Sequence, residues 1–301
     1  MNIKEIVGNE KVKEMLEKAV TTHTVSHSYL FTGIEGIGKK EIARAFAQMI
    51  LCENEEEKPC NTCKSCLQFE NANHPDFMQI EAVERTIKIE QIRYMQEKIA
   101  EKPIVSSNKV YIIEDSDTMT KEAQNCLLKT LEEPPSYAII ILIATNESKL
   151  LNTIKSRCIK VPFQKIAEED ILRYMLEKQH KEMTKEEVAL CEGSLAKAMK
   201  WEEKKELYNK VQNVIQNIEK VDLIDLWQKT EFLYKAKEDI YTILDYMISI
   251  LYHTKEIKKM NCIAYVEETK KRLLANSNYD MSVDNLLMKM WEEVNEKYNR
   301  G

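Results

Sequence analysis

The chain has 301 residues, of which 44% are hydrophobic and 31% are charged, and its formal net charge is −6. This hydrophobic fraction is enough to build a core, so the composition excludes a disordered chain, and the mild negative charge argues against a protein that coats nucleic acid unaided. Six prolines and six glycines are few for this length, which predicts a helix-rich protein of two or three domains with short connections.

The first ten residues are charged and contain no apolar core, so no signal peptide is visible. The longest apolar run, Tyr137 to Ala144, is far too short to span a bilayer. We therefore expect a cytoplasmic protein with no membrane partner, in a reducing compartment where cysteines are thiols or metal ligands.

A glycine-rich segment at residues 33–40 has the pattern of a phosphate-binding loop. Residues 29–31 before it read as a strand, and residues 41–47 after it read as a helix. In such a loop the glycines turn backbone N–H groups toward an anion, and a lysine reaches the outer oxygens. The residues that fill these roles are Gly33, Gly36, Gly38 and Lys39.

One position of this loop departs from the pattern. Lys40 stands where a serine or threonine hydroxyl would coordinate Mg²⁺, and an ammonium group cannot ligate a cation and repels it. The sequence therefore predicts a phosphate-loop fold that neither binds Mg²⁺ well nor hydrolyses ATP efficiently. ATP binding itself stays open, because Lys39 and the backbone donors can hold phosphate without a metal ion.

Four cysteines follow with the spacing C-x7-C-x2-C-x2-C, namely Cys52, Cys60, Cys63 and Cys66. Four sulfur ligands within fifteen residues favour tetrahedral, structural Zn²⁺, because no further ligand offers an open catalytic position. An iron–sulfur cluster and four unligated thiols are the alternatives. His74 follows at a distance, and we expect it to be a surface or turn residue.

An apolar strand is predicted at residues 109–113, and Glu114 and Asp115 follow it directly. Phosphate-loop ATPases keep their metal-binding and water-activating carboxylates at this place, in the order Asp then Glu. Here the order is inverted, and a carboxylate moved by one methylene group misplaces the reacting atoms enough to impair turnover. The alternative is an acidic segment whose only role is to stabilise the start of the next helix.

A helix is predicted from about Met119 to Glu133, where two prolines end it, and residues 138–144 form a fully apolar strand. Buried strands that alternate with helices predict a parallel sheet. Asn146 follows this strand, where such ATPases keep a polar residue near the outer phosphate. A lone Asn at a strand end fits a turn equally well.

These motifs, in this order, resemble those of the bacterial DNA polymerase III clamp-loader subunits, which belong to the AAA+ class. The match is strong over the first half of the chain and weak over the rest. Besides the loop and the cysteines, it rests on His27 to Phe31, Asn125 to Pro135, Ala144 to Asn146 and Ser156 to Cys158. The resemblance implies an α/β domain with a RecA-like parallel sheet, followed by all-α domains.

Within that family, gamma and tau subunits keep an intact phosphate loop, whereas delta-prime has lost hydrolysis and keeps a Ser-Arg-Cys arginine. Lys40, the inverted pair Glu114 and Asp115, and a length short of a tau-type chain favour the delta-prime type. The resemblance implies that Arg157 acts in trans, at a neighbouring subunit's ATP site, where it stabilises the transferred phosphoryl group. The alternative is a surface arginine that pairs with a local acid.

From Ile166 onward glycine and proline nearly vanish, and apolar residues recur at helical spacing. Amphipathic helices are predicted at residues 223–233 and 240–252, with a final helix around residues 286–291. The resemblance implies a helical lid and an oligomerising collar here. The predicted domains are an AAA+ nucleotide-binding-like domain at 1–165 with a zinc module at 52–66, a lid at 166–205 and a collar at 206–301.

The resemblance implies a largely ATPase-inactive subunit that works with gamma or tau motor subunits and a delta subunit to load a sliding clamp onto primed DNA. One rival is an active gamma- or tau-type ATPase in which Lys40 is tolerated. A second rival is a zinc-dependent DNA-binding module. The loop between the cysteines is acidic and has few basic residues, which argues against that module.

Overall fold

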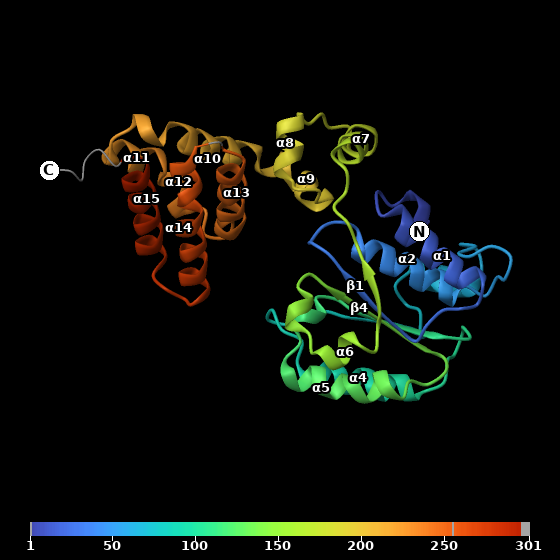
Figure 1. Cartoon of the computed structure of the whole chain (residues 1–301). Helices are drawn as coiled ribbons and strands as arrows, with labels where there is room; N and C mark the ends of the chain where they lie inside the picture. Colours follow the sequence, from blue (N-terminus) through green and yellow to red (C-terminus); the bar gives the residue numbers. More distant parts are fainter. Residues whose placement is uncertain (1, 255, 296–301) are drawn as a thin grey trace. The chain divides into compact units, whose positions relative to one another are not determined.

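The computed structural model describes residues 2–254 and 256–295 of the chain. Contacts between residues divide the chain into two compact units, Met1–Ala198 and Met199–Gly301, and each unit is described by itself. Figure 1 shows a sheet with helices on both of its faces in the first unit, and helices in the second. The first unit holds the predicted nucleotide-binding-like domain and most of the predicted lid.

A five-stranded sheet lies at the centre of the first unit. Its strands are β1 (Ser28–Thr32), β2 (Phe77–Ile80), β3 (Lys109–Ile113), β4 (Ala138–Ala144) and β5 (Ile159–Pro162). All neighbouring strands pair in parallel, in the order β2-β3-β4-β1-β5, which confirms the predicted parallel sheet. β3 and β4 are buried along their whole length and have the predicted bounds.

Helices cover both faces of this sheet. One face carries α1 (Glu10–Thr21) and α2 (Lys39–Leu51), and the other carries α4 (Ile89–Ala100), α5 (Lys121–Glu132) and α6 (Asn152–Lys155) (Figure 1). Fully buried apolar side chains, among them Ile92, Met95, Leu127 and Leu142, form a continuous core on the side of α4 and α5. Each such side chain stabilises the fold by about 1.5–3 kcal/mol, so this layer is a main source of the unit's stability.

Three short helices follow the sheet: α7 (Glu168–Gln179), α8 (Lys185–Leu190) and α9 (Leu195–Trp201). The apolar residues that predicted helices here, such as Ile171, Met175 and Val188, are buried. The predicted helical character of the segment is therefore confirmed.

The second unit is built from helices in its described residues. They are α10 (Lys205–Asn217), α11 (Leu223–Lys229), α12 (Glu231–Lys235), α13 (Ile240–His253), α14 (Ile257–Leu274) and α15 (Tyr279–Val294). α13, α14 and α15 lie side by side (Figure 1). The single helix predicted at residues 223–233 breaks at Thr230, whose hydroxyl donates to the Leu226 carbonyl at 2.8 Å.

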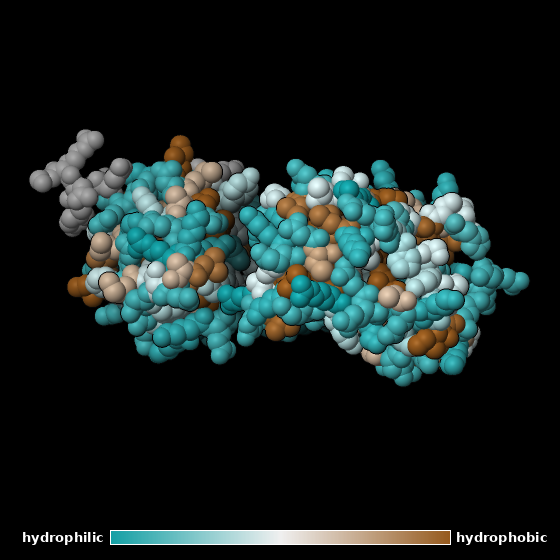
Figure 2. Space-filling model, turned by 90° about the horizontal axis from the view of Figure 1, so that it is seen from below, coloured by the Kyte–Doolittle hydropathy of each residue, from teal (hydrophilic) through white to brown (hydrophobic). Residues whose placement is uncertain are grey.

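Hydrophilic side chains cover most of the surface seen in Figure 2, with apolar side chains scattered among them. This agrees with the 31% of charged residues in the sequence. In the described ranges, no helix is both long enough and apolar enough to cross a membrane.

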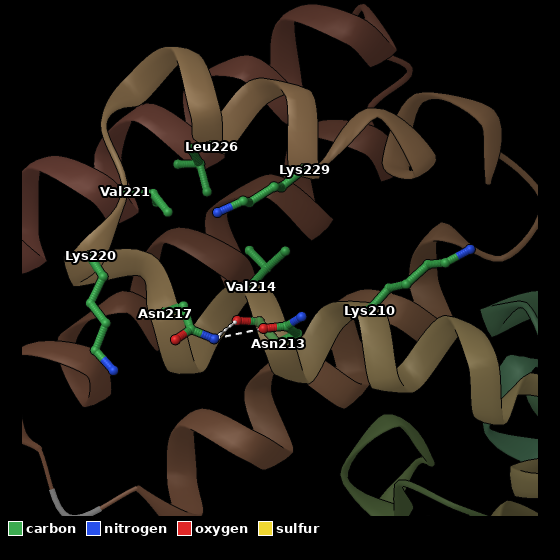
Figure 3. A pocket seen from close by; sticks show the side chains of 8 residues that line it. All are labelled: Lys210, Asn213, Val214, Asn217, Lys220, Val221, Leu226 and Lys229. Carbon is green, nitrogen blue, oxygen red and sulfur yellow. Dashed lines mark hydrogen bonds between the residues drawn. The ribbon is translucent and has the colours of Figure 1, made fainter.

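A recess of about 290 Å³ lies between α10 and α11 in the second unit (Figure 3). It is lined by Lys210, Asn213, Val214, Asn217, Lys220, Val221, Leu226 and Lys229. The three lysines are exposed and Leu226 is buried, and no acidic side chain belongs to the lining. The recess therefore has an apolar wall and a basic rim.

A buried aspartate fixes the loop between α4 and β3. Asp76 is 2% exposed, and its carboxylate accepts the N–H groups of Ile104, Val105 and Ser106 at 2.8, 2.7 and 2.9 Å. Three donors to one carboxylate replace the water that it loses on burial. Because Asp76 directly precedes β2, these bonds hold the start of β2 beside the chain that enters β3.

Replacing Asp76 by alanine should lower the free energy of unfolding by about 2–4 kcal/mol, because three backbone donors lose a charged acceptor. Urea unfolding followed by far-UV circular dichroism measures this, since all three tryptophans lie beyond residue 198. Asp170→Ala makes the same chemical change at a surface position of α7 and should cost less than about 1 kcal/mol. Equal losses for the two variants would contradict the assignment.

Candidate functional site

The predicted phosphate-binding loop connects β1 to α2, where the carboxyl ends of the strands meet. Gly36 and Gly38 have φ angles of 77° and 88°, which residues with a Cβ atom rarely adopt. A Cβ atom at Gly36 would also lie 2.3 Å from Ser194 Oγ, so glycine is required there on two grounds. α2 begins at Lys39, and the N–H groups of its first turn are available to an anion.

The Lys39 side chain is 6% exposed and forms hydrogen bonds with the backbone of its own loop. Its ammonium group donates to the carbonyl oxygens of Gly33 and Ile34, each at 2.6 Å. Burial lowers the pKa of Lys39, and nearby carboxylates, Asp115 first among them, partly offset this. The acceptors are neutral oxygens, so an anionic oxygen that enters the loop can compete for the ammonium group.

Lys40 contacts the acidic edge of the sheet. Its Nζ atom lies 2.8 Å from Glu114 Oε2 and 3.2 Å from Glu81 Oε1. Glu81 follows β2 and Glu114 follows β3, so two neighbouring parallel strands bring these carboxylates together. Burial raises the pKa of Glu114 and Lys40 partly reverses the shift. A cation of the chain itself thus pairs with Glu114, the carboxylate that the sequence predicts as the metal ligand.

The acidic segment after β3 forms hydrogen bonds with the end of the neighbouring strand β4. Asp117 accepts the N–H groups of Thr145 and Asn146 at 3.1 and 3.2 Å, which joins it to the end of β4. Burial raises the pKa of Asp115, and Asp117 adds to the shift. Asp115 stands at the N-cap of the 3-10 turn Ser116–Thr118 without a side-chain cap bond, and Thr120 caps α5, so neither Glu114 nor Asp115 caps α5. Asp117 was not among the predicted site residues, because no local spacing indicates its contact with β4.

Asn146 lies at the end of β4 with its side chain exposed. Its Oδ1 atom accepts the N–H and O–H groups of Ser148 at 3.0 and 2.6 Å, so it caps the following 3-10 turn. In the isolated chain Asn146 is thus a turn residue, and a contact with phosphate stays a prediction.

Arg157 follows α6, and its side chain is 34% exposed. The guanidinium lies 2.7 Å from Glu132 Oε1 and donates to the Thr153 carbonyl at 2.9 Å. In the isolated chain Arg157 therefore pairs with a local acid, and such an exposed pair contributes only about 0–1 kcal/mol. Ser28, buried at the start of β1, donates to the Arg157 carbonyl at 2.6 Å and fixes the backbone there.

The segment before α9 contacts the phosphate-binding loop within the first unit. The Ala196 N–H group donates to the Gly36 carbonyl at 3.2 Å, and Ser194 is buried against the same glycine. The beginning of α9 therefore lies directly beside the loop.

The four cysteines of the predicted module converge in space. Their Sγ atoms all lie within 4.8 Å of one another, and those of Cys60 and Cys66 are 4.0 Å apart. Backbone N–H groups donate to the sulfurs of Cys52, Cys60 and Cys63 at 3.3–3.4 Å. Hydrogen bonds from Thr62 lower the pKa of Cys60 to about 6, which favours the thiolate that a metal ion needs. The cluster can hold one metal ion.

His74 is 5% exposed, so it is not a surface residue, but its carbonyl accepts the Phe77 N–H at 3.3 Å, which confirms the expected turn position. Its Nε2 atom lies 2.8 Å from Ser65 Oγ, and its Nδ1 atom accepts the Asp76 N–H at 3.0 Å. Ser65 belongs to α3 (Lys64–Glu70) and donates to the Leu51 carbonyl at 2.6 Å. Burial lowers the pKa of His74, which keeps the ring neutral. This chain of hydrogen bonds connects the cysteine module to α2 and β2.

A family model described as DNA polymerase III, delta subunit, matches residues 8–167, which is more than half of the chain. The chain belongs to the gamma, tau and delta-prime family of DNA polymerase III clamp-loader subunits. It is 38% identical to DNA polymerase III subunit delta' of Bacillus subtilis over 154 residues, which are 51% of this chain and 47% of that protein. It is 35% identical to subunit tau of the same organism over 192 residues, 64% of this chain and 33% of the relative.

A third relative is subunit tau/gamma of Haemophilus influenzae, 36% identical over 172 residues, 57% of this chain and 25% of the relative. The chain thus spans between a quarter and about a half of the length of these clamp-loader proteins. A crystal structure of a DNA polymerase III gamma subunit-related protein from Thermotoga maritima has the same fold, with a TM-score of 0.52 at 18% identity, covering 95% of this chain and 99% of that one.

Replacing Lys40 by methionine should lower the free energy of unfolding by about 1–3 kcal/mol at pH 7, because the partly buried Glu114 carboxylate loses its cation. The loss should grow as the pH rises through the raised pKa of Glu114 in the folded chain, because Lys40 partly offsets the effect of burial on that pKa and the substitution removes the offset.

The double substitution Lys40→Met with Glu114→Gln should recover most of this loss. Urea unfolding of all four members of the cycle, at pH 5 and pH 8, measures the coupling. Strictly additive effects of the two substitutions would show that the ion pair is energetically unimportant.

Proposed function

We propose that this chain is a delta-prime type of clamp-loader subunit that does not hydrolyse ATP efficiently by itself. The ion pair between Lys40 and Glu114 carries the proposal. An ATPase of this fold needs a hydroxyl and a free carboxylate to hold Mg²⁺, and here the two positions neutralise each other. The loop can hold an anion, but it lacks the groups that position a metal ion.

The second part of the proposal is that Arg157 stabilises the transferred phosphoryl group in the ATP site of a neighbouring gamma or tau subunit. Its weak pairing with Glu132 supports this, because a triphosphate competes easily with one exposed carboxylate. Ser28 supports it as well, since it holds the Arg157 backbone against the sheet. With a delta subunit, the assembly would open a sliding clamp and place it on primed DNA during replication.

We further propose that the cysteine cluster holds a structural Zn²⁺ ion. A zinc–sulfur distance of about 2.3 Å places tetrahedral sulfurs about 3.8 Å apart, and the four Sγ atoms can reach that arrangement with small shifts. The ligands would be Cys52, Cys60, Cys63 and Cys66. The ion would join the end of α2 to α3 and perform no chemistry.

The rival function is an active gamma- or tau-type ATPase. Sequence identity does not separate the two, because the tau/gamma relatives match at 35–36% and the delta' relative at 38%. Lys40 favours the non-hydrolysing type, since its ammonium group occupies the Glu114 carboxylate.

The purified chain should show no Mg²⁺-dependent ATP hydrolysis above the level of its Lys39→Ala variant.

In a loader reconstituted with motor and delta subunits, Arg157→Ala should remove hydrolysis at one site per assembly, with a loss there of about 10³-fold or more, because the arginine supplies charge to the transition state.

Single-turnover hydrolysis with labelled ATP measures this, and size-exclusion chromatography checks that the assembly is intact. Arg173→Ala, at another exposed arginine, is the matched control and should change nothing. Steady hydrolysis by the isolated chain, or unaltered hydrolysis in the Arg157→Ala loader, would refute the proposal.

The purified chain should contain one zinc ion, measured by inductively coupled plasma mass spectrometry. Cys60→Ser and Cys66→Ser should each lose the metal and lower the unfolding temperature, because the module loses its crosslink. Cys191→Ser, at a buried cysteine outside the module, should keep the metal. Iron at the same sites, or a chain without metal, would overturn the assignment to zinc.

A further inference from the structure

We propose that the phosphate-binding loop of this chain binds a polyphosphate anion, such as the triphosphate of a nucleotide, without a divalent metal ion, and that Lys40 takes the place of that ion. This goes beyond the proposed function, which requires no ligand in this loop.

The part of the site that binds anions is intact. Within the described residues, the backbone N–H groups of the loop from Gly36 to Lys39 donate to no other backbone group. Gly36 and Gly38 have the positive φ angles that turn such groups to one side. Lys39 is buried beside them, and its ammonium group donates to the neutral carbonyl oxygens of Gly33 and Ile34, with the Asp115 and Asp117 carboxylates nearby. An entering phosphate oxygen therefore gains a charged donor and several backbone donors.

The part that should bind Mg²⁺ does not fit the ion. A cation at Glu114 would lie beside the Lys40 ammonium group, which repels it and is 2.8 Å from the same carboxylate. The hydroxyl ligand is also missing, because Lys40 occupies its position. Mg²⁺ would have to displace Lys40 from both Glu114 and Glu81 before it could bind.

Lys40 has the geometry to replace the ion. An ammonium group has three N–H donors, and two of them point to carboxylates, Glu114 at 2.8 Å and Glu81 at 3.2 Å. The third remains for an oxygen of the bound anion. Lys40 would then bridge protein carboxylate and phosphate, as a divalent ion does in an ATPase of this fold. Because Lys40 is the second residue of α2 and Lys39 the first, both lysines belong to the helix terminus that attracts the anion.

Isothermal titration calorimetry on the full chain tests this with ATP in excess EDTA and with ATP in excess Mg²⁺. The chain should bind ATP at least as tightly in EDTA as in Mg²⁺. Lys40→Ser removes the internal cation and restores the hydroxyl. We expect it to bind ATP about tenfold more weakly in EDTA and more tightly when Mg²⁺ is added, since about tenfold corresponds to one charge-assisted contact.

Lys39→Ala should lose binding under both conditions, and Lys210→Ser, the same change as Lys40→Ser in the second unit, should bind as the unchanged chain does. Inorganic tripolyphosphate in EDTA identifies the source of recognition. Equal binding means that the phosphates alone are recognised, and weaker binding means that the nucleoside contributes; both support the proposal.

ATP binding that requires Mg²⁺ in the unchanged chain, or no binding of either anion in EDTA, would overturn the inference. Neither result would bear on Arg157, whose role is read from hydrolysis in the assembled loader. The gain of Mg²⁺ dependence in Lys40→Ser also separates a changed site from a misfolded chain, because a misfolded chain gains nothing.

Discussion

Lys40 and Glu114 lie 2.8 Å apart at the carboxyl edge of the sheet, one in the first turn of α2 and the other directly after β3. The sequence predicts these as the two positions from which a phosphate-loop ATPase holds its metal ion. The pair satisfies a partly buried carboxylate, and it also removes both groups from metal binding. We propose that this one ion pair both stabilises the sheet edge and prevents efficient hydrolysis.

Lys39 and the glycines have the geometry of a phosphate-binding loop, and Arg157 has a partly exposed guanidinium on a backbone fixed by Ser28. Under the proposed function, Arg157 would supply charge to a neighbour's reaction while the chain's own site stays inactive. The cysteine module supports the same layout, because Ser65 and His74 connect it to the end of α2 and to the start of β2.

Features encoded in local spacing were predictable from the sequence. The glycine-rich pattern predicted the loop with Lys39, and the cysteine spacing predicted a cluster whose sulfurs converge. The apolar runs predicted β3 and β4 with their bounds. Contacts between distant segments were not predictable. Glu81 reaches Lys40, and Asp117 reaches the end of β4, only because the parallel sheet places strand ends together. His74 is buried because Ser65 and Asp76 surround it, which no neighbouring residue signals.

In the second unit, helix prediction from the sequence failed for a different reason. α14 was not predicted, because its buried stripe is narrow and includes two polar residues. The buried positions are Lys259, Cys262, Val266, Thr269 and Leu273. Thr230 ended a predicted helix early through a hydrogen bond to its own preceding turn. Hydrophobic spacing is a weak guide where a helix buries so little apolar surface.

Electron paramagnetic resonance of Mn²⁺, used in place of Mg²⁺, tests the central claim most directly. With ATP present, the account predicts no more Mn²⁺ bound to the unchanged chain than to its Lys39→Ala variant, and about one ion per chain bound after Lys40→Ser, the usual stoichiometry of a single metal site. One Mn²⁺ ion bound to the unchanged chain together with ATP would contradict it.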